Sequence, residues 1–195
     1  MESYNIVNIQ EIETFKKGES YKGEITVFTS DIGPKFLLFG NKSVYLNAFS
    51  YMLVLSGRAT LLVDSVEYPI DAHSLCILSP LHLTNFRQVS RDFQCLCLCS
   101  RKNFIDRLPI LNIQHRITHG MNMYHYPIVQ ISEEEKPLLA STMEDLRIQL
   151  FRTEHSYQLE MIQNALTRYY LEIDNILDNK GINEVTERVP QTRYA

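Results

Sequence analysis

The chain has 195 residues, 45% of them hydrophobic and 22% charged, which is typical of one globular domain or of one domain with a small appendage. Its net charge is −4 and it has no run of basic residues, so we expect no nucleic-acid surface of its own. It shows neither a secretory signal nor an apolar run near the roughly 18 residues of a membrane span. The four cysteines do not form a spaced disulfide framework, which predicts a cytoplasmic protein with reduced thiols.

Residues 21–99 have the rhythm of short strands, because apolar runs alternate with Gly, Pro, Asn, Asp and Ser. A spacing of about ten residues per strand favours an antiparallel sandwich or barrel. Asp64 and Ser65, between Val63 and Val66, predict a tight hairpin turn, although Asp-Ser leaves the turn type open. The predicted strands lie in KGEITVFTS, PKFLLFGNKS, SYMLVLSG, RATLLVDSVEYPI, SLCILSP and LTNFRQVSRDFQCLCLC.

Three cysteines, Cys95, Cys97 and Cys99, stand at alternate positions of the last of these strands. Successive side chains in a strand point to opposite faces, so the three thiols share one face. Cysteines two apart on a strand are poorly placed for a disulfide, and zinc sites space their cysteine pairs two to four residues apart across a turn. Because free cysteine packs as a small hydrophobe, we interpret this stretch as the core face of a strand.

Beyond residue 101 the apolar period becomes helical. A short helix is predicted to begin after Ser100 as N-cap and to end at Pro109. The stretch NMYHYP fits an edge strand or a loop. A longer helix follows the capping-box spacing of Ser132 and Glu135, with its start placed nearer residue 136 by Pro137.

The last helix is the clearest element of the sequence. Ser156 is its candidate N-cap, and Gly181 stands where a C′ glycine belongs. Its apolar residues form an a/d heptad seam, which predicts either packing on the preceding helix or pairing across a homodimer. The seam residues, taken as the dimerisation candidates, are Leu159, Ile162, Leu166, Tyr169, Ile173 and Ile176.

No arrangement of residues predicts catalysis or a metal site. There is no His-x-His, no Gly-x-Ser-x-Gly and no Gly-rich phosphate loop, and cysteines in an apolar strand make poor thiolates. His82 is the sole hint of a metal ligand, and a pocket or strand role suits it better. A small-molecule site needs apolar walls with a few polar groups. The residues that offer such groups are Tyr45, Asn47, Tyr51, Arg58, His82 and Arg87.

The strand pattern resembles the N-terminal cupin-like domain of AraC-type transcription regulators. The matching features are the glycine turn at Gly57, the LLVDSVEYPI hairpin, LCILSP, and the strand that carries Ser90, Asp92 and Phe93. The match runs from about residue 21 to residue 180. Where the family has Gly-Asp before its sixth strand, this chain has Ala72-His73, so we expect that turn to be reshaped.

The resemblance implies a mainly β fold, a cupin-like antiparallel β-barrel (jelly roll) followed by a C-terminal α-helical hairpin. Residues 1–128 are expected to form the barrel with an N-terminal segment and a short helix, 129–180 the dimerising hairpin, and 181–195 a linker. The implied function is to sense a small effector and to control an attached helix-turn-helix half that this sequence lacks. We expect no enzyme activity and no cofactor. The alternative is a stand-alone cupin, either a metal-dependent enzyme or an interaction module.

Overall fold

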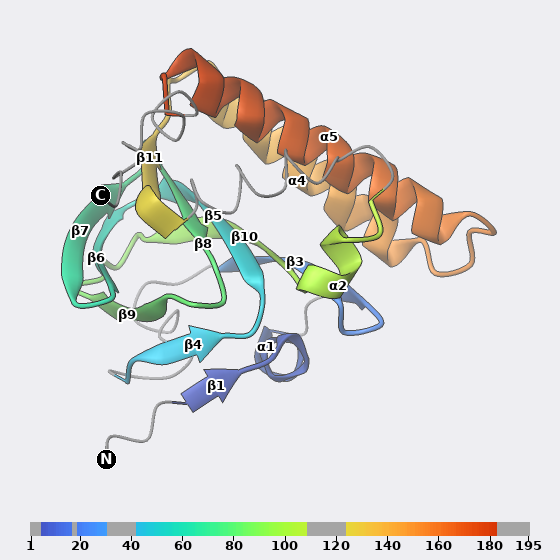
Figure 1. The fold of residues 1–195 in the computed structure, drawn as a ribbon, viewed down its shortest axis with the longest axis horizontal. Coiled ribbons are helices and arrows are strands. Elements are labelled where there is room, and N and C mark those ends of the chain that lie inside the picture. Colours follow the sequence, from blue (N-terminus) through green and yellow to red (C-terminus); the bar gives the residue numbers. More distant parts are fainter. Residues whose placement is uncertain (1–4, 17–18, 31–41, 109–123, 183–195) are drawn as a thin grey trace, which may run out of the picture.

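The computed structural model describes residues 5–16, 19–30, 42–108 and 124–182. Two β-sheets pack on each other, and two long helices cover the outer side of one sheet (Figure 1). The predicted class, mainly β with a C-terminal helical pair, is confirmed. The arrangement is compatible with a jelly roll, while the described strands do not show a closed barrel.

The larger sheet has six strands in the order β11-β8-β5-β10-β3-β2, all paired antiparallel. Strand β11 pairs with β8, so the expected boundary between residues 128 and 129 falls inside this sheet. The strands are β2 (Glu19–Tyr21), β3 (Ile25–Ser30), β5 (Phe49–Ser56), β8 (Ser74–Leu78), β10 (Gln94–Ser100) and β11 (Ile128–Gln130).

The smaller sheet has five strands in the order β1-β4-β9-β6-β7. Only the pair β1 and β4 is parallel among the described strands of this sheet. The hairpin predicted at Asp64 and Ser65 joins β6 to β7, and both turn residues have positive φ, 49° and 73°, as a type I′ turn requires. The strands are β1 (Asn5–Val7), β4 (Val44–Leu46), β6 (Arg58–Val63), β7 (Val66–Asp71) and β9 (Leu83–Arg87).

Both faces of the six-stranded sheet are buried, and each strand alternates between them. On β10, Leu96 and Leu98 face the helices. The thiols of Cys95, Cys97 and Cys99 face the smaller sheet, and all are free and buried. The prediction that these three cysteines line one core face is therefore confirmed.

Four helices are described: α1 (Ile9–Lys16), α2 (Lys102–Ile105), α4 (Glu135–Phe151) and α5 (Gln158–Asn179). The capping box before α4 is confirmed, because the Glu135 N–H donates to Ser132 Oγ at 3.1 Å and the Ser132 N–H donates to Glu135 Oε2 at 2.7 Å. Gly181, at φ 68°, ends α5 in a Schellman motif, with Ile182 N–H bonded to the Leu177 carbonyl.

The heptad seam of α5 faces the interior of its own chain. Its residues from Ile162 to Ile176 are buried and Leu159 is partly buried, all within the core that α4, α5 and the six-stranded sheet share. This is the first of the two expected arrangements of the seam. A homodimer stays a prediction, and on α5 the face left for it is the outer one, where Leu171 is 47% exposed.

Several local details differ from the sequence-based expectation. Ser100 is buried at the end of β10, so the residue before α2 is Arg101, and Tyr157 rather than Ser156 precedes α5. Of the predicted strand in residues 34–43, all but the last two residues lie outside the described part, as do Pro109 and residues 183–195 of the expected linker. Among the described helices, none has the length and apolar character needed to cross a membrane.

Candidate functional site

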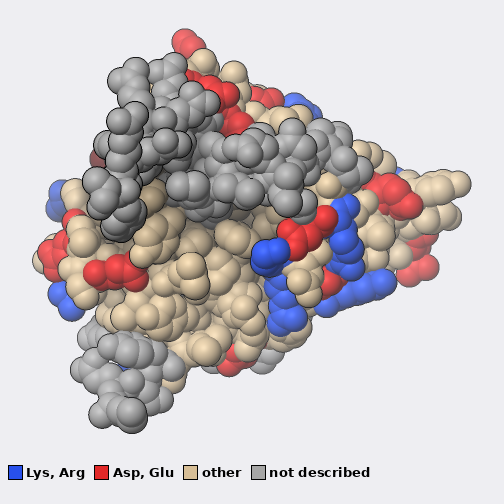
Figure 2. Space-filling view, in the orientation of Figure 1, with Lys and Arg blue, Asp and Glu red and all other residues tan. Residues whose placement is uncertain are grey.

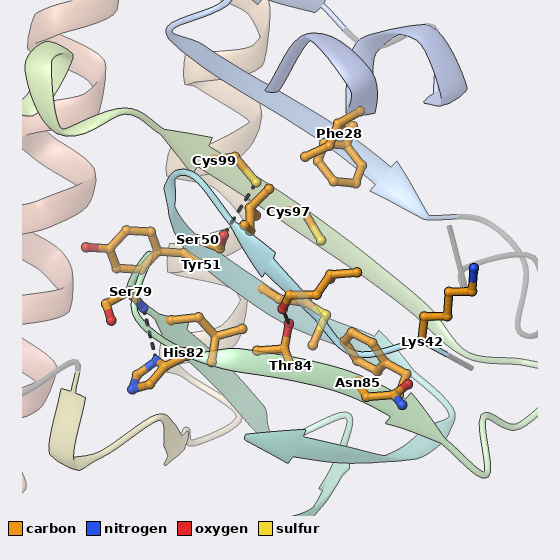
Figure 3. Close-up of a pocket in the computed structure, with 16 residues that line it drawn as sticks. Phe28, Lys42, Ser50, Tyr51, Ser79, His82, Thr84, Asn85, Cys97 and Cys99 are labelled. Carbon is orange, nitrogen blue, oxygen red and sulfur yellow. Dashed lines mark hydrogen bonds between the residues drawn. The ribbon is translucent and has the colours of Figure 1, made fainter. Parts of the chain in front are cut away.

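A pocket of about 110 Å³ lies between the two sheets (Figure 3). Its walls come from α1, from β3, β5, β8 and β10 of the larger sheet, and from β4 and β9 of the smaller one. Most of the lining is apolar, which is the character of small-molecule sites. The polar side chains in it are few, and each has a definite place.

The pocket exists because Ser50 of β5 and Cys97 and Cys99 of β10 are small side chains at inward positions of two neighbouring strands. Ser50 of β5 lies opposite Cys99 of β10, and Met52 lies opposite Cys97. The Cys99 thiol donates to Ser50 Oγ at a distance of 3.7 Å. Larger residues at these positions would fill the space between the sheets, since protein interiors are close-packed.

The Cys99 thiol of the pocket wall is protonated at neutral pH. Burial raises the pKa of Cys99 to about 12. It raises the pKa of Cys76 even further; Cys76 lies on β8, where it is the cross-strand partner of Met52 on β5. The sulfur atoms of Cys95 and Cys97 are 3.5 Å apart. Within the described ranges, no group of three or more His, Cys, Asp or Glu side chains is placed to hold a metal ion. Cys97 and Cys99, the two buried cysteines that line the pocket, therefore serve as apolar wall.

His82 closes one side of the pocket (Figure 3). Its side chain is 2% exposed, and its Nδ1 accepts from the Ser79 N–H at 3.1 Å. The other ring nitrogen, Nε2, must then carry the proton, and it lies 3.3 Å from the Tyr124 carbonyl oxygen. The imidazole ring of His82 also stacks on the ring of Tyr124, with the centroids 5.2 Å apart. Burial lowers the pKa of His82, against a smaller opposing effect of Asp64, so the neutral form is favoured.

Lys42 and Asn85 lie on the other side of the pocket from His82 (Figure 3). Lys42 is exposed, whereas Asn85 is buried on β9. Near them, the Thr84 hydroxyl donates to the Val44 carbonyl at 3.3 Å and so ties β9 to β4. The pocket thus has a cation at one side, a neutral histidine at the other and an apolar wall between them.

Tyr51 borders the pocket through its strand, but its ring points away from it, toward the helices (Figure 3). The ring meets Tyr169 and Tyr170 of α5 edge-on, with centroid distances of 5.4 and 5.5 Å. Burial raises the pKa of Tyr51 well above its ordinary value, so the phenol stays neutral. One residue of β5 thereby joins the pocket wall to α5.

Of the six predicted ligand residues, Tyr51 and His82 border the pocket and the other four do not. Asn47 is exposed and donates to Asn8 Oδ1 at 3.0 Å, and Arg87 pairs with Glu67 at 3.2 Å on the outer side of the smaller sheet. Arg58 is exposed, and Tyr45 is half-buried on β4 outside the lining.

The sequence prediction missed most of the lining. Phe28, Lys42, Ser50 and Asn85 were not singled out, and Cys97 was assigned to the core alone. The available signal was the small size of the alternate residues on β10 and of Ser50, because a strand face built from Ser and Cys leaves room that Leu or Ile would fill.

No protein-family model and no curated protein matches the chain. Among solved structures, it is similar to apo ToxT K231A from Vibrio cholerae, with 12% identity, 80% of this chain and 57% of that one covered, and a TM-score of 0.47. The AraC-like transcriptional activator CuxR gives 11% identity, coverages of 73% and 47%, and a TM-score of 0.40. A Cupin 2 conserved barrel domain protein from Salinispora arenicola gives 17% identity, coverages of 43% and 66%, and a TM-score of 0.32.

The chain spans a little over half the length of the ToxT chain, 57%. These structural neighbours include an AraC-like activator and a cupin barrel protein. All three TM-scores are below 0.5, and the function proposed below is argued from the pocket and contacts of this chain.

Proposed function

We propose that the chain is the ligand-sensing domain of an AraC-type transcription regulator. The observation that carries this proposal is the apolar pocket between the sheets, whose described lining includes one cation and one neutral histidine. Such a site binds a small, largely apolar molecule with one polar end. Binding rather than chemistry is therefore its proposed role.

Two routes connect the pocket to the helical pair. The first passes from the β5 wall through Tyr51 to Tyr169 and Tyr170 of α5. The second passes from His82 to the Tyr124 carbonyl, just before β11, and the capping box of α4 begins two residues after that strand. A ligand shifts the helices only if it binds their two arrangements with different affinity.

DNA contact is assigned to a helix-turn-helix half attached to this domain. On the face shown in Figure 2, lysines and arginines gather near α2, with acidic side chains among them. Lys102 pairs with Asp106, and Arg107 pairs with Glu24. A surface of paired charges offers little to a phosphate backbone, in line with the net charge of −4.

The proposed homodimer is assigned to the outer face of the helical pair. The seam of α5 is already buried, whereas Ile148 and Phe151 of α4 and Leu171 of α5 are each about half exposed, at 49%, 50% and 47%. These are the large apolar side chains of the two helices that the proposed association would cover. Sedimentation of the chain measures whether it is a monomer or a homodimer.

Hydrogen exchange of the 195-residue chain with a bound pocket ligand tests the sensing role. We expect slower exchange in β5 and β10 together with α4 and α5, because both routes order the helices. Slower exchange confined to the strands would contradict sensing while leaving binding intact.

The DNA-binding role is tested by sequencing the gene. We expect the reading frame to continue past codon 195 into two helix-turn-helix motifs, and a stop codon there would contradict the DNA-binding role.

A further inference from the structure

The floor of the pocket is rich in sulfur. It consists of two directly opposed pairs on adjacent strands, Ser50 with Cys99 and Met52 with Cys97. Three of these four side chains carry sulfur, and two of the four are cysteines with no branch or ring. Sulfur is polarisable and makes favourable contacts with aromatic rings. The floor is therefore suited to the face or edge of a planar ring.

The size of the pocket limits what lies on this floor. An engineered apolar cavity of about 150 Å³ in another protein binds benzene. The present pocket, at about 110 Å³, is somewhat smaller and is not fully enclosed. One ring fits within it, and a second ring fits only toward its open side. A long flexible chain would also lose more conformational freedom on binding than a rigid ring loses.

Charge complementarity places the polar end of the ligand. The floor thiols are buried and burial raises the pKa of Cys99, so a charged group gains nothing there and loses its hydration. His82 is neutral, with both ring nitrogens engaged at 3.1 and 3.3 Å. Lys42 is the one cation among the described residues that line the pocket, and it is exposed. An anionic group is therefore favoured on the side of Lys42.

We propose, given the ligand-sensing function proposed above, that this pocket binds a planar aromatic carboxylate of one or two rings. The ring lies over Ser50, Cys97 and Cys99, and the carboxylate points toward Lys42. Phe28 lies on the same side as Lys42 and adds an aromatic wall (Figure 3). Cys97 and Cys99 thereby select the shape of the ligand, and Lys42 selects its charge.

The test compares three acids with the same wild-type chain by calorimetry. The probes are 2-naphthoate, its fully saturated counterpart decahydro-2-naphthoate, and decanoate as a flexible chain acid. We expect 2-naphthoate to bind about five-fold more tightly than the saturated acid, because the saturated ring is thicker and makes no sulfur–aromatic contact. Equal affinity of the first two acids, or tightest binding of decanoate, would overturn the ligand class.

Lys42→Ala tests the position of the carboxylate without disturbing the core, since Lys42 is exposed. We expect about three-fold weaker binding of 2-naphthoate and a reduced dependence on salt, as for a solvent-exposed ion pair. The matched control is Lys102→Ala, which removes an exposed lysine whose side chain is 70% accessible and which does not line the pocket. Equal losses in the two variants would contradict the placement at Lys42.

Benzene, which has no charge, separates failure of this ligand class from failure of the proposed function. It should shift the methyl resonance of Met52 if the pocket admits any small apolar molecule. A response to benzene without preference for the aromatic acid overturns the ligand class and leaves the sensing role standing. No response of Met52 to benzene or to any of the acids overturns the pocket as a binding site, and with it the proposed function.

Discussion

The two faces of the six-stranded sheet are built from the same strands but are packed differently. On β10, Leu96 and Leu98 face the helices, where large aliphatic and aromatic side chains fill the space. The alternate positions, which include Cys97 and Cys99, face the smaller sheet and leave a pocket. Strand parity therefore separates two tasks within one strand: one face supplies stability, and the other supplies room for a ligand.

This difference predicts that equal chemical changes have unequal effects on the two faces. Truncation or charge on the helix-facing side removes well-packed contacts and should cost stability. Changes on the pocket-facing side alter side chains that border empty space, so they should affect binding more than folding. The largest contrast is expected on α5, where the buried and exposed faces lie on one helix.

Leu166→Glu and Leu171→Glu place the same charge on opposite faces of α5. Leu166 is fully buried, so Leu166→Glu should lower the free energy of unfolding by about 4 kcal/mol or more, because a charge is buried without a partner. Leu171 is 47% exposed, so Leu171→Glu should leave the free energy of unfolding of the monomer within about 0.5 kcal/mol of the wild-type value. Urea unfolding measures both values.

Sedimentation of the same two variants tests the dimer. We expect Leu171→Glu to be a folded monomer if the outer helical face associates. A folded monomer of Leu166→Glu with wild-type stability would instead return the heptad seam to a dimer interface. A Leu171→Glu variant that sediments like a dimeric wild type would move the interface away from α5.

A second contrast compares neighbouring residues of β10. Leu98→Ala should cost about 3 kcal/mol, since Leu98 is fully buried against the helices and its removal leaves a cavity. Cys97→Ala, one position away, should cost about 1 kcal/mol, because one sulfur atom is removed beside an existing pocket. Chemical denaturation gives both values, and equal losses would show that the two faces are packed alike.

His82 provides a smaller, pH-dependent effect. Its pKa is lowered by burial, so the folded state favours the neutral ring. The associated stability is present above the unfolded pKa of about 6.5 and is lost as the pH falls through the folded value. Protonated His82 cannot accept the Ser79 N–H, so we expect a loss of about 1–2 kcal/mol between pH 7 and pH 5.

His82→Asn should reduce this pH dependence, since the Asn oxygen can accept the Ser79 N–H at any pH. His73→Asn is the control, because His73 is exposed and pairs with the exposed Glu133 at 3.5 Å. Thermal melting from pH 7 to pH 5 measures both variants against the wild type. An unchanged slope in His82→Asn would assign the pH dependence to other groups.

The features that the sequence predicted well are set by neighbouring residues. The hairpin turn at Asp64 and Ser65, the capping box of Ser132 and Glu135, and the helix end at Gly181 each depend on a few adjacent positions. The common face of the three cysteines likewise follows from strand parity alone. Such local constraints can be recognised in a single sequence.

The pocket depends instead on pairing between distant strands. Arg58 and Arg87 are polar residues on strands, as His82 is a polar residue beside one, yet only His82 faces the space between the sheets. Tyr51 has the parity opposite to Ser50 and Met52, so its ring belongs to the helix side. Strands β1 and β4 were missed because each has only three residues and because they pair with each other from distant parts of the sequence. Which face points inward is decided by tertiary packing.

The smallest expected effect is a gain in stability from filling the pocket. Cys97→Val adds volume beside empty space, so it should raise the free energy of unfolding by about 0.5 kcal/mol. Ala165→Val also enlarges a side chain, but on the helix side of the sheet. It should lower the free energy of unfolding by about 1 kcal/mol, because Ala165 lies buried in a filled core. Opposite signs for the two substitutions require one hollow face and one filled face. A loss of stability in both variants would mean that the space above Cys97 is closed in solution. Benzene should then give the same response of Met52 in Cys97→Val as in the wild type, because it enters neither protein.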